Sequence, residues 1–224
     1  MLNTNNRIIT SIFLLILGAI FLINCNNSQT RTNRENGRTE LVPEPDRHYR
    51  LLFEAMQKLK KTNCVFSKPD TSLCGITLSD AANVNTVIGT NNIVGKEEKY
   101  HFYSKTNNET LTLTPHQEYG KSQIVVIKVT YSDTINHHYK QLNFGTFETE
   151  KGIKLGMTQE ELTRLLGNCY AVVDSTKDFI ELYYRIENAQ NNKTEISKNH
   201  KEWAYYAIYG FWKNRLQTFE FGFK

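Results

Sequence analysis

The sequence contains none of the short motifs that identify common classes of enzyme. G-x-S-x-G, H-E-x-x-H, the Walker A loop and G-x-G-x-x-G are all absent. Lys and Arg exceed Asp and Glu by only four residues, and nucleic-acid binding requires clustered basic side chains. We therefore expect a protein that is not an enzyme, carries no cofactor and does not bind nucleic acid.

The sequence has one long apolar run, residues 8–23, and Arg7 precedes it. A positive start followed by an apolar stretch is typical of an export signal, and this run is short for a membrane span. The tetrapeptide LINC that follows, residues 22–25, resembles the bacterial lipobox, whose cysteine is lipidated and becomes the first mature residue. We predict a signal peptide over residues 1–24 and a lipid such as palmitate on Cys25.

Two other interpretations of this start stay open, an uncleaved membrane anchor and simple secretion with no role for Cys25. All three place the folded part outside the cytoplasm. We predict a location in the cell envelope, at the outer membrane of a Gram-negative bacterium. Residues 25–45 are polar and almost free of apolar side chains, which predicts a flexible tether.

Three further cysteines are present, Cys64, Cys74 and Cys169. Disulfides persist outside the cytoplasm, and Cys64 and Cys74 are close enough in sequence to close a small loop. We expect that pair, which leaves Cys169 as a buried thiol. Pairing with Cys169 instead stays open, as does a catalytic thiol.

Residues 46–74 are predicted to form an N-terminal helix and loop. A helix is expected over residues 47–61, with Asp46 as its N-cap, because apolar residues recur there at helical spacing. This apolar stripe favours packing of the helix on the protein core over a position on a membrane surface.

Two later segments, residues 75–89 and 152–167, follow one pattern. Each runs Gly-Ile-x-Leu, then a capping residue, apolar positions at helical spacing and a final Gly. Asp80 is the expected cap of the first helix, and Thr158 with Glu161 forms a capping box in the second.

Three stretches rich in β-branched and aromatic residues follow each of these helices. They are residues 99–105, 110–114 and 123–131, then residues 179–186, 203–212 and 216–223. We predict an α+β fold of two tandem repeats, each a short helical segment followed by about three antiparallel strands. The repeats would span residues 75–150 and 151–224 and share a core, paired edge to edge or face to face.

The segment KGIKLGMTQEELTRLLG, residues 151–167, precedes aromatic antiparallel strands. It resembles the small α+β unit of BamE-like (SmpA/OmlA) outer-membrane lipoproteins. Two such units in tandem are similar to the fold of the β-lactamase inhibitory protein. The resemblance covers about residues 75–224 and implies a protein-binding role, but no binding residue carries over, because neither a partner-binding motif nor the inhibitor's cysteine spacing is present.

The histidines do not form a metal-binding pattern. His137 and His138 are adjacent, so a strand would point them to opposite faces and they would not share one metal ion. The other four are scattered: His48, His101, His116 and His200. We expect solvated histidines and no metal site.

The stretch over residues 203–212 holds the densest group of aromatic residues. In a strand, Tyr205, Tyr209 and Phe211 share one face, and Tyr206 and Trp212 share the other. We expect one face to pack on a helix, and we hypothesise that Tyr206 and Trp212 bind a protein. Burial of both faces is the alternative.

These observations favour a lipid-anchored, non-enzymatic protein-binding module whose partner is an envelope or secreted protein. The alternative hypothesis is an inhibitor or immunity protein that acts against a secreted toxin or hydrolase. An enzyme built around His137 or Cys169 is the third hypothesis.

Overall fold

The computed structural model describes residues 47–62, 64, 66–67, 69–89, 92, 98–116, 120–132, 138–186 and 204–224. The chain divides into two units, Met1–Pro45 and Asp46–Lys224, and every described residue belongs to the second. The predicted signal peptide, the tether, Cys25, His137 and His200 lie outside the described residues.

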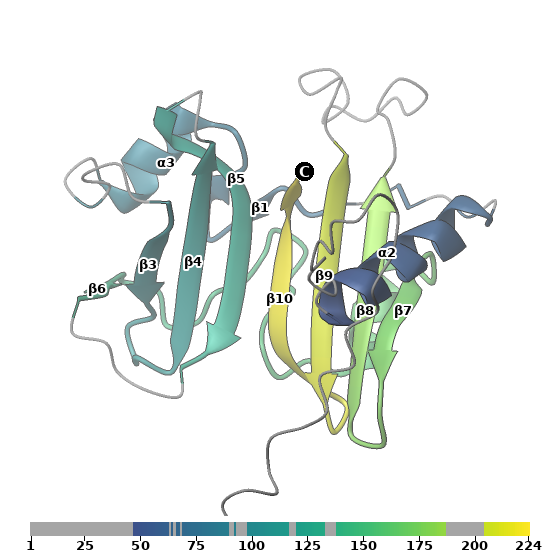
Figure 1. The fold of residues 1–224 in the computed structure, drawn as a ribbon. Helices are drawn as coiled ribbons and strands as arrows, with labels where there is room; N and C mark the ends of the chain where they lie inside the picture. Colours follow the sequence, from purple (N-terminus) through teal and green to yellow (C-terminus); the bar gives the residue numbers. More distant parts are fainter. Residues whose placement is uncertain are drawn as a thin grey trace, which may run out of the picture. The chain divides into compact units, whose positions relative to one another are not determined.

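One eight-stranded sheet dominates the described part of the chain (Figure 1). Its strand order is β6-β3-β4-β5-β10-β9-β8-β7. Neighbouring strands are antiparallel, except for β3 and β6, which are parallel. The strands are β3 (Tyr100–Tyr103), β4 (Glu109–His116), β5 (Gly120–Tyr131), β6 (Lys140–Gln141), β7 (Ala171–Ser175), β8 (Phe179–Ile186), β9 (Tyr205–Trp212) and β10 (Arg215–Phe223). A separate two-stranded sheet consists of β1 (Ser72–Leu73) and β2 (Ile76–Thr77).

The predicted fold of two small tandem repeats is wrong. The structure is a sheet-rich α+β fold in which β5 pairs directly with β10, with Ile127 opposite Phe221, so one continuous ladder crosses both halves of the sequence. A sheet of about three strands would leave open edges, and backbone groups at an open edge gain hydrogen bonds by pairing. At this junction a Cβ on Gly222 would lie 2.2 Å from the carbonyl oxygen of Val125, so the absence of a side chain permits the close approach.

The two short helices begin and end as their sequences predict. In α3 (Ala81–Ile88), the Asp80 side chain accepts a hydrogen bond from the Asn83 backbone N–H. In α4 (Gln159–Leu166), Thr158 and Glu161 form the predicted capping box. Satisfying these first-turn groups fixes where each helix starts.

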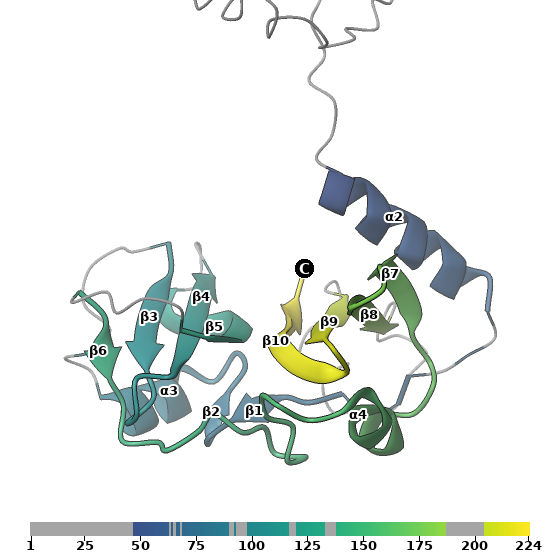
Figure 2. The same ribbon diagram turned by 90° about the horizontal axis from the view of Figure 1, so that it is seen from below.

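One face of the sheet, which we call the core face, packs against α3, α4, β1 and β2 (Figure 2). Alternate residues of the central strands point into this core, as the strand period requires. On β9 and β10 these include Tyr205, Ala207, Tyr209, Phe211, Phe219, Phe221 and Phe223. Phe219, Phe221 and Phe223 of β10 alternate along the strand on this side of the sheet.

The N-terminal helix α2 (Arg47–Lys60) lies on the opposite face of the sheet, which we call the α2 face. It contacts β7 and β8. Ala55 is buried there beside Ala171, Val173 and Tyr183, in a small apolar cluster separate from the main core. The helix therefore covers only one end of the α2 face.

Candidate functional site

The remaining part of the α2 face is polar and is not covered by any described helix (Figure 2). Its side chains come from β4, β5 and β10, where strand register places them in rows. Thr112, Lys128 and Glu220 form one row, and Thr110, Thr130 and Thr218 form the next. We call this surface the threonine face: Thr110, Thr112, Thr114, Lys128, Thr130, Thr218 and Glu220.

The charges on the threonine face neutralise each other. Lys128 Nζ lies 3.6 Å from Glu220 Oε2, and the Tyr206 hydroxyl donates a hydrogen bond of 2.7 Å to Glu220 Oε1. Burial raises the pKa of Tyr206, and the neighbouring Glu220 raises it further, so this phenol stays a donor. A partner that covers the face meets hydroxyl groups and one paired charge, which limits the desolvation cost of binding.

The two predicted binding residues differ in their environments. Tyr206 is half-buried beside the apolar cluster under α2, and its hydroxyl donates a hydrogen bond to Glu220. Trp212 is 48% exposed at the end of β9, opposite Phe179 of β8. Because neighbouring strands align them, Phe179 and Trp212 lie on the α2 face. The structure therefore leaves Trp212, but not Tyr206, as an accessible aromatic anchor.

Ion pairs hold the border between α2 and the sheet. Arg47 Nη2 lies 3.3 Å from Asp174 Oδ2, and His48 Nδ1 lies 3.8 Å from Glu181 Oε1. Burial raises the pKa of Glu181, while the nearby His48 opposes that shift. These contacts position α2 and do not form a catalytic arrangement with a nucleophile.

A second polar cluster lies inside the core. Asp70 is fully buried, and its Oδ1 atom lies 3.7 Å from Lys151 Nζ. Burial raises the pKa of Asp70 to about 6, although Lys151 partly offsets the shift. Tyr205 and Tyr209 are buried nearby. Burial raises the pKa of both phenols, and the negative charge of Asp70 raises it further. The sequence reasoning missed this cluster, because no local pattern shows that Asp70 is buried.

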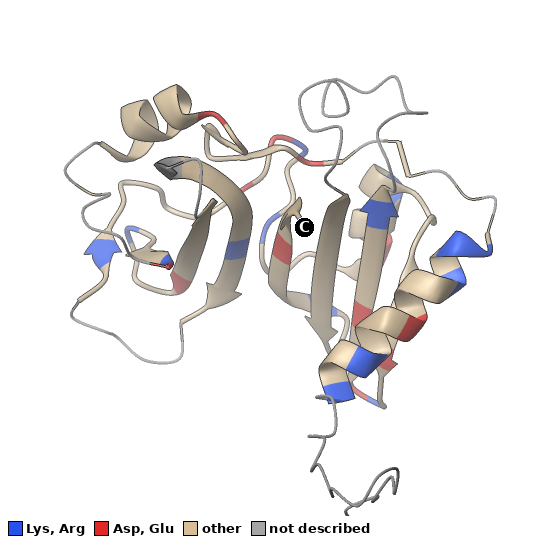
Figure 3. Cartoon of the chain, turned by 45° about the horizontal axis from the view of Figure 1, so that its top comes forward, with Lys and Arg blue, Asp and Glu red and all other residues tan. Residues whose placement is uncertain are grey.

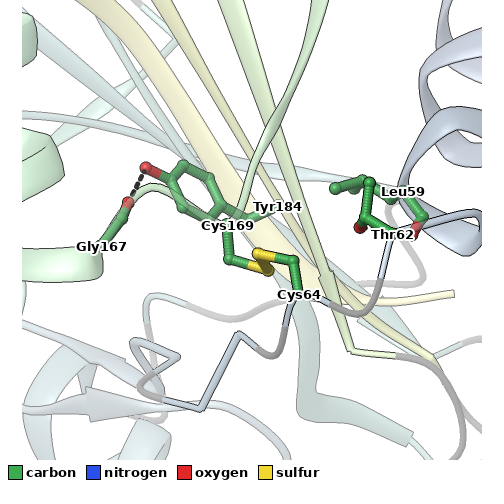
Figure 4. Close-up of a disulfide and its surroundings, with 6 residues drawn as sticks. All are labelled: Leu59, Thr62, Cys64, Gly167, Cys169 and Tyr184. Atoms are coloured by element: carbon green, nitrogen blue, oxygen red, sulfur yellow. Dashed lines mark hydrogen bonds between the residues drawn. A yellow bond between two sulfur atoms is a disulfide. The ribbon is translucent and has the colours of Figure 1, made fainter.

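The disulfide differs from the expected pairing. Cys64 bonds to Cys169 (Figure 4), whereas Cys74 remains a half-buried thiol. The pairing of Cys64 with Cys74 was therefore wrong. Cys64 follows α2 and Cys169 precedes β7, and α2 packs on β7, so the two sulfur atoms meet. Next to the bond, the Tyr184 hydroxyl donates a hydrogen bond of 2.9 Å to the Gly167 carbonyl.

Within the described ranges, no group of three or more His, Cys, Asp or Glu residues is placed to hold a metal ion. His101 instead stacks on Tyr139, with ring centroids 4.6 Å apart. None of the helices described here is long and apolar enough to cross a membrane.

No protein-family model matches the chain, and no curated protein or solved structure matches it either.

Proposed function

We propose that this chain is a non-enzymatic binding protein of the bacterial cell envelope, held at the membrane by a lipid on Cys25. It recognises an envelope or secreted protein through the threonine face, with Trp212 as the anchor at the border. The observation that supports this proposal is the asymmetry of the sheet. One face is packed throughout, whereas helix α2 covers only one end of the other.

The chemistry of the face suits protein recognition. Interfaces favour exposed Trp and Tyr at their centres and a polar surround, and Trp212 is 48% exposed next to rows of threonine. The Lys128–Glu220 pair leaves no uncompensated charge at the middle of the face. Threonine hydroxyls both donate and accept hydrogen bonds, so they can pair with main-chain groups of a partner.

The test is recovery of partners with the tagged full-length chain, extracted from envelopes in mild detergent. Trp212→Ala is compared with Val172→Ala, because Val172 is also an exposed apolar residue on a strand, at 38%. We expect a specific partner to be recovered with wild type and Val172→Ala and to be lost with Trp212→Ala. Equal recovery of every partner by all three proteins would contradict the proposed role of this face.

The inhibitor or immunity hypothesis was based on tandem repeats together with export, and the structure does not contain the repeats. We therefore do not propose it.

A further inference from the structure

Helix α2 carries two exposed aromatic residues outside the stripe that packs on the sheet, on the part of its surface that we call the outward side. Helix residues advance by 100° each, so the side chains that pack on the sheet around Ala55 leave positions 49 and 53 on other sides of the helix. Tyr49 is 60% exposed and Phe53 is 52% exposed, more than any other large hydrophobic residue in the described ranges. The Tyr49 ring also lies under the ammonium group of Lys224, 5.6 Å from its centroid.

The positive charge of the chain is concentrated on this helix. Residues 47–61 contain five Lys or Arg and a single acid, Glu54. The whole chain has 27 basic and 23 acidic residues, so residues outside 47–61 contain equal numbers of each. Figure 3 shows basic segments at both ends of α2 with one acidic segment between them. Arg47 pairs with Asp174. Lys58, Lys60 and Lys61 are exposed around the C-terminal end of the helix.

The helix also stands directly after the predicted tether. Residues 25–45 separate the predicted lipid attachment at Cys25 from the first turn of α2. Of all described elements, α2 is the one that follows this tether in the chain, and the anchor would keep it near lipid headgroups.

We propose that the outward side of α2 docks on an anionic lipid surface, with Tyr49 and Phe53 at the headgroup level and the lysines against lipid phosphates. Aromatic side chains favour the membrane interface, and cations near an anionic leaflet are attracted to it. The proposal rests on the envelope location proposed above. Because α2 and the threonine face lie on the same side of the sheet, docking turns that face toward the bilayer and favours a partner that is itself held at the membrane.

The experiment places one tryptophan reporter in the full-length chain, reconstituted into vesicles that contain lipids with brominated acyl chains. Trp203 and Trp212 are first replaced by Phe, and the reporter is then introduced as Phe53→Trp. The matched control is Tyr131→Trp, because Tyr131 is also an exposed aromatic but its ring lies near Gly156 on the core side of the sheet. Vesicles of phosphatidylethanolamine with phosphatidylglycerol are compared with phosphatidylcholine alone.

We expect bromine quenching of the F53W reporter in the anionic vesicles, and little quenching of the Y131W control. Replacing Lys58, Lys60 and Lys61 with Gln is expected to lower the docked fraction, by about fivefold in the docked-to-undocked ratio per cation removed. Far-UV circular dichroism shows whether each variant is folded, and Tyr49→Trp supplies a second reporter at the same lipid interface if Phe53→Trp is destabilised.

Equal quenching of both reporters, or equal quenching of F53W in anionic and neutral vesicles, would overturn the proposal. So would full quenching in the lysine variant. Loss of a protein partner on Phe53→Ala without any lipid quenching would assign this side of α2 to a protein interface instead. Failure here leaves the Trp212 test unaffected, and N-terminal mass spectrometry tests the lipid on Cys25 separately.

Discussion

Cys64 and Cys169 form a disulfide across a sequence separation of 105 residues. The bond links the segment that follows α2 to the segment that immediately precedes β7. A cross-link that closes so long a loop restricts the unfolded chain strongly, which in the chain-entropy account stabilises a protein by about 5 kcal/mol.

We therefore predict that Cys64→Ser/Cys169→Ser lowers the free energy of unfolding by about 2–5 kcal/mol, as measured by urea denaturation. Cys74→Ser is the control, because Cys74 is in no disulfide. A reductant should lower the stability of wild type and of the control, and it should leave the double variant unchanged. Equal stability of wild type with and without reductant would argue against the bond.

Asp70 should make the free energy of unfolding depend on pH. Burial raises its pKa from the ordinary 3.8 to about 6 in the folded protein, so the folded state binds this proton more tightly than the unfolded state. The resulting stabilisation is complete below the unfolded value and is lost as pH rises through about 6. Two units of pKa correspond to about 3 kcal/mol.

Asp70→Asn removes this titration, so we predict that the stability difference between variant and wild type changes between pH 4 and 7, in favour of the variant at the higher pH. Urea denaturation at several pH values measures it, and the subtraction cancels the other carboxylates. Parallel stability curves for the two proteins would show that Asp70 does not titrate in this window.

The junction between β5 and β10 depends on Gly222. An added Cβ would lie 2.2 Å from the Val125 carbonyl oxygen and 2.8 Å from the Val126 Cα, which real side chains cannot tolerate without movement of the backbone. Gly222→Ala is expected to destabilise the protein by about 2 kcal/mol or more. Gly145→Ala is the control, since nothing lies within 4 Å of its added Cβ. If thermal unfolding showed equally small losses of stability for Gly222→Ala and Gly145→Ala, the close pairing of β5 with β10 would be contradicted.

Substitutions at Tyr206 and Trp212 are expected to affect different properties, the first stability and the second partner binding. Tyr206→Phe removes the donor to Glu220 and is expected to cost about 1 kcal/mol of unfolding free energy, with partner recovery retained. Trp212→Ala should show the reverse, with partner binding lost and stability nearly unchanged, because Trp212 is largely exposed. Loss of binding by Tyr206→Phe alone would move the binding site toward α2.

Local sequence patterns predicted the local structure well. The caps of α3 and α4, the helix over 47–60 and six of the strands depend on residues near one another in the chain. The strands β1, β6 and β7 were not predicted. β1 and β6 have two residues each, and β7 has five, so none of them carries a clear period.

Long-range features were not accessible from sequence. The pairing of β5 with β10, the choice of Cys169 by Cys64 and the burial of Asp70 each depend on contacts between distant segments. Alternation along β9 predicted which aromatic residues share a face. It could not predict that Tyr206 is half-buried beside the cluster under α2 while Trp212 is exposed.

The most direct test of the binding role is photo-crosslinking in living cells. A photoreactive phenylalanine replaces Thr112 or Thr218 on the threonine face in the full-length chain, and Val172 serves as the control position on the edge strand β7. The account predicts a discrete crosslinked protein from both threonine positions and none from Val172. Crosslinks from Val172 alone, or no crosslink from the threonine face, would contradict it.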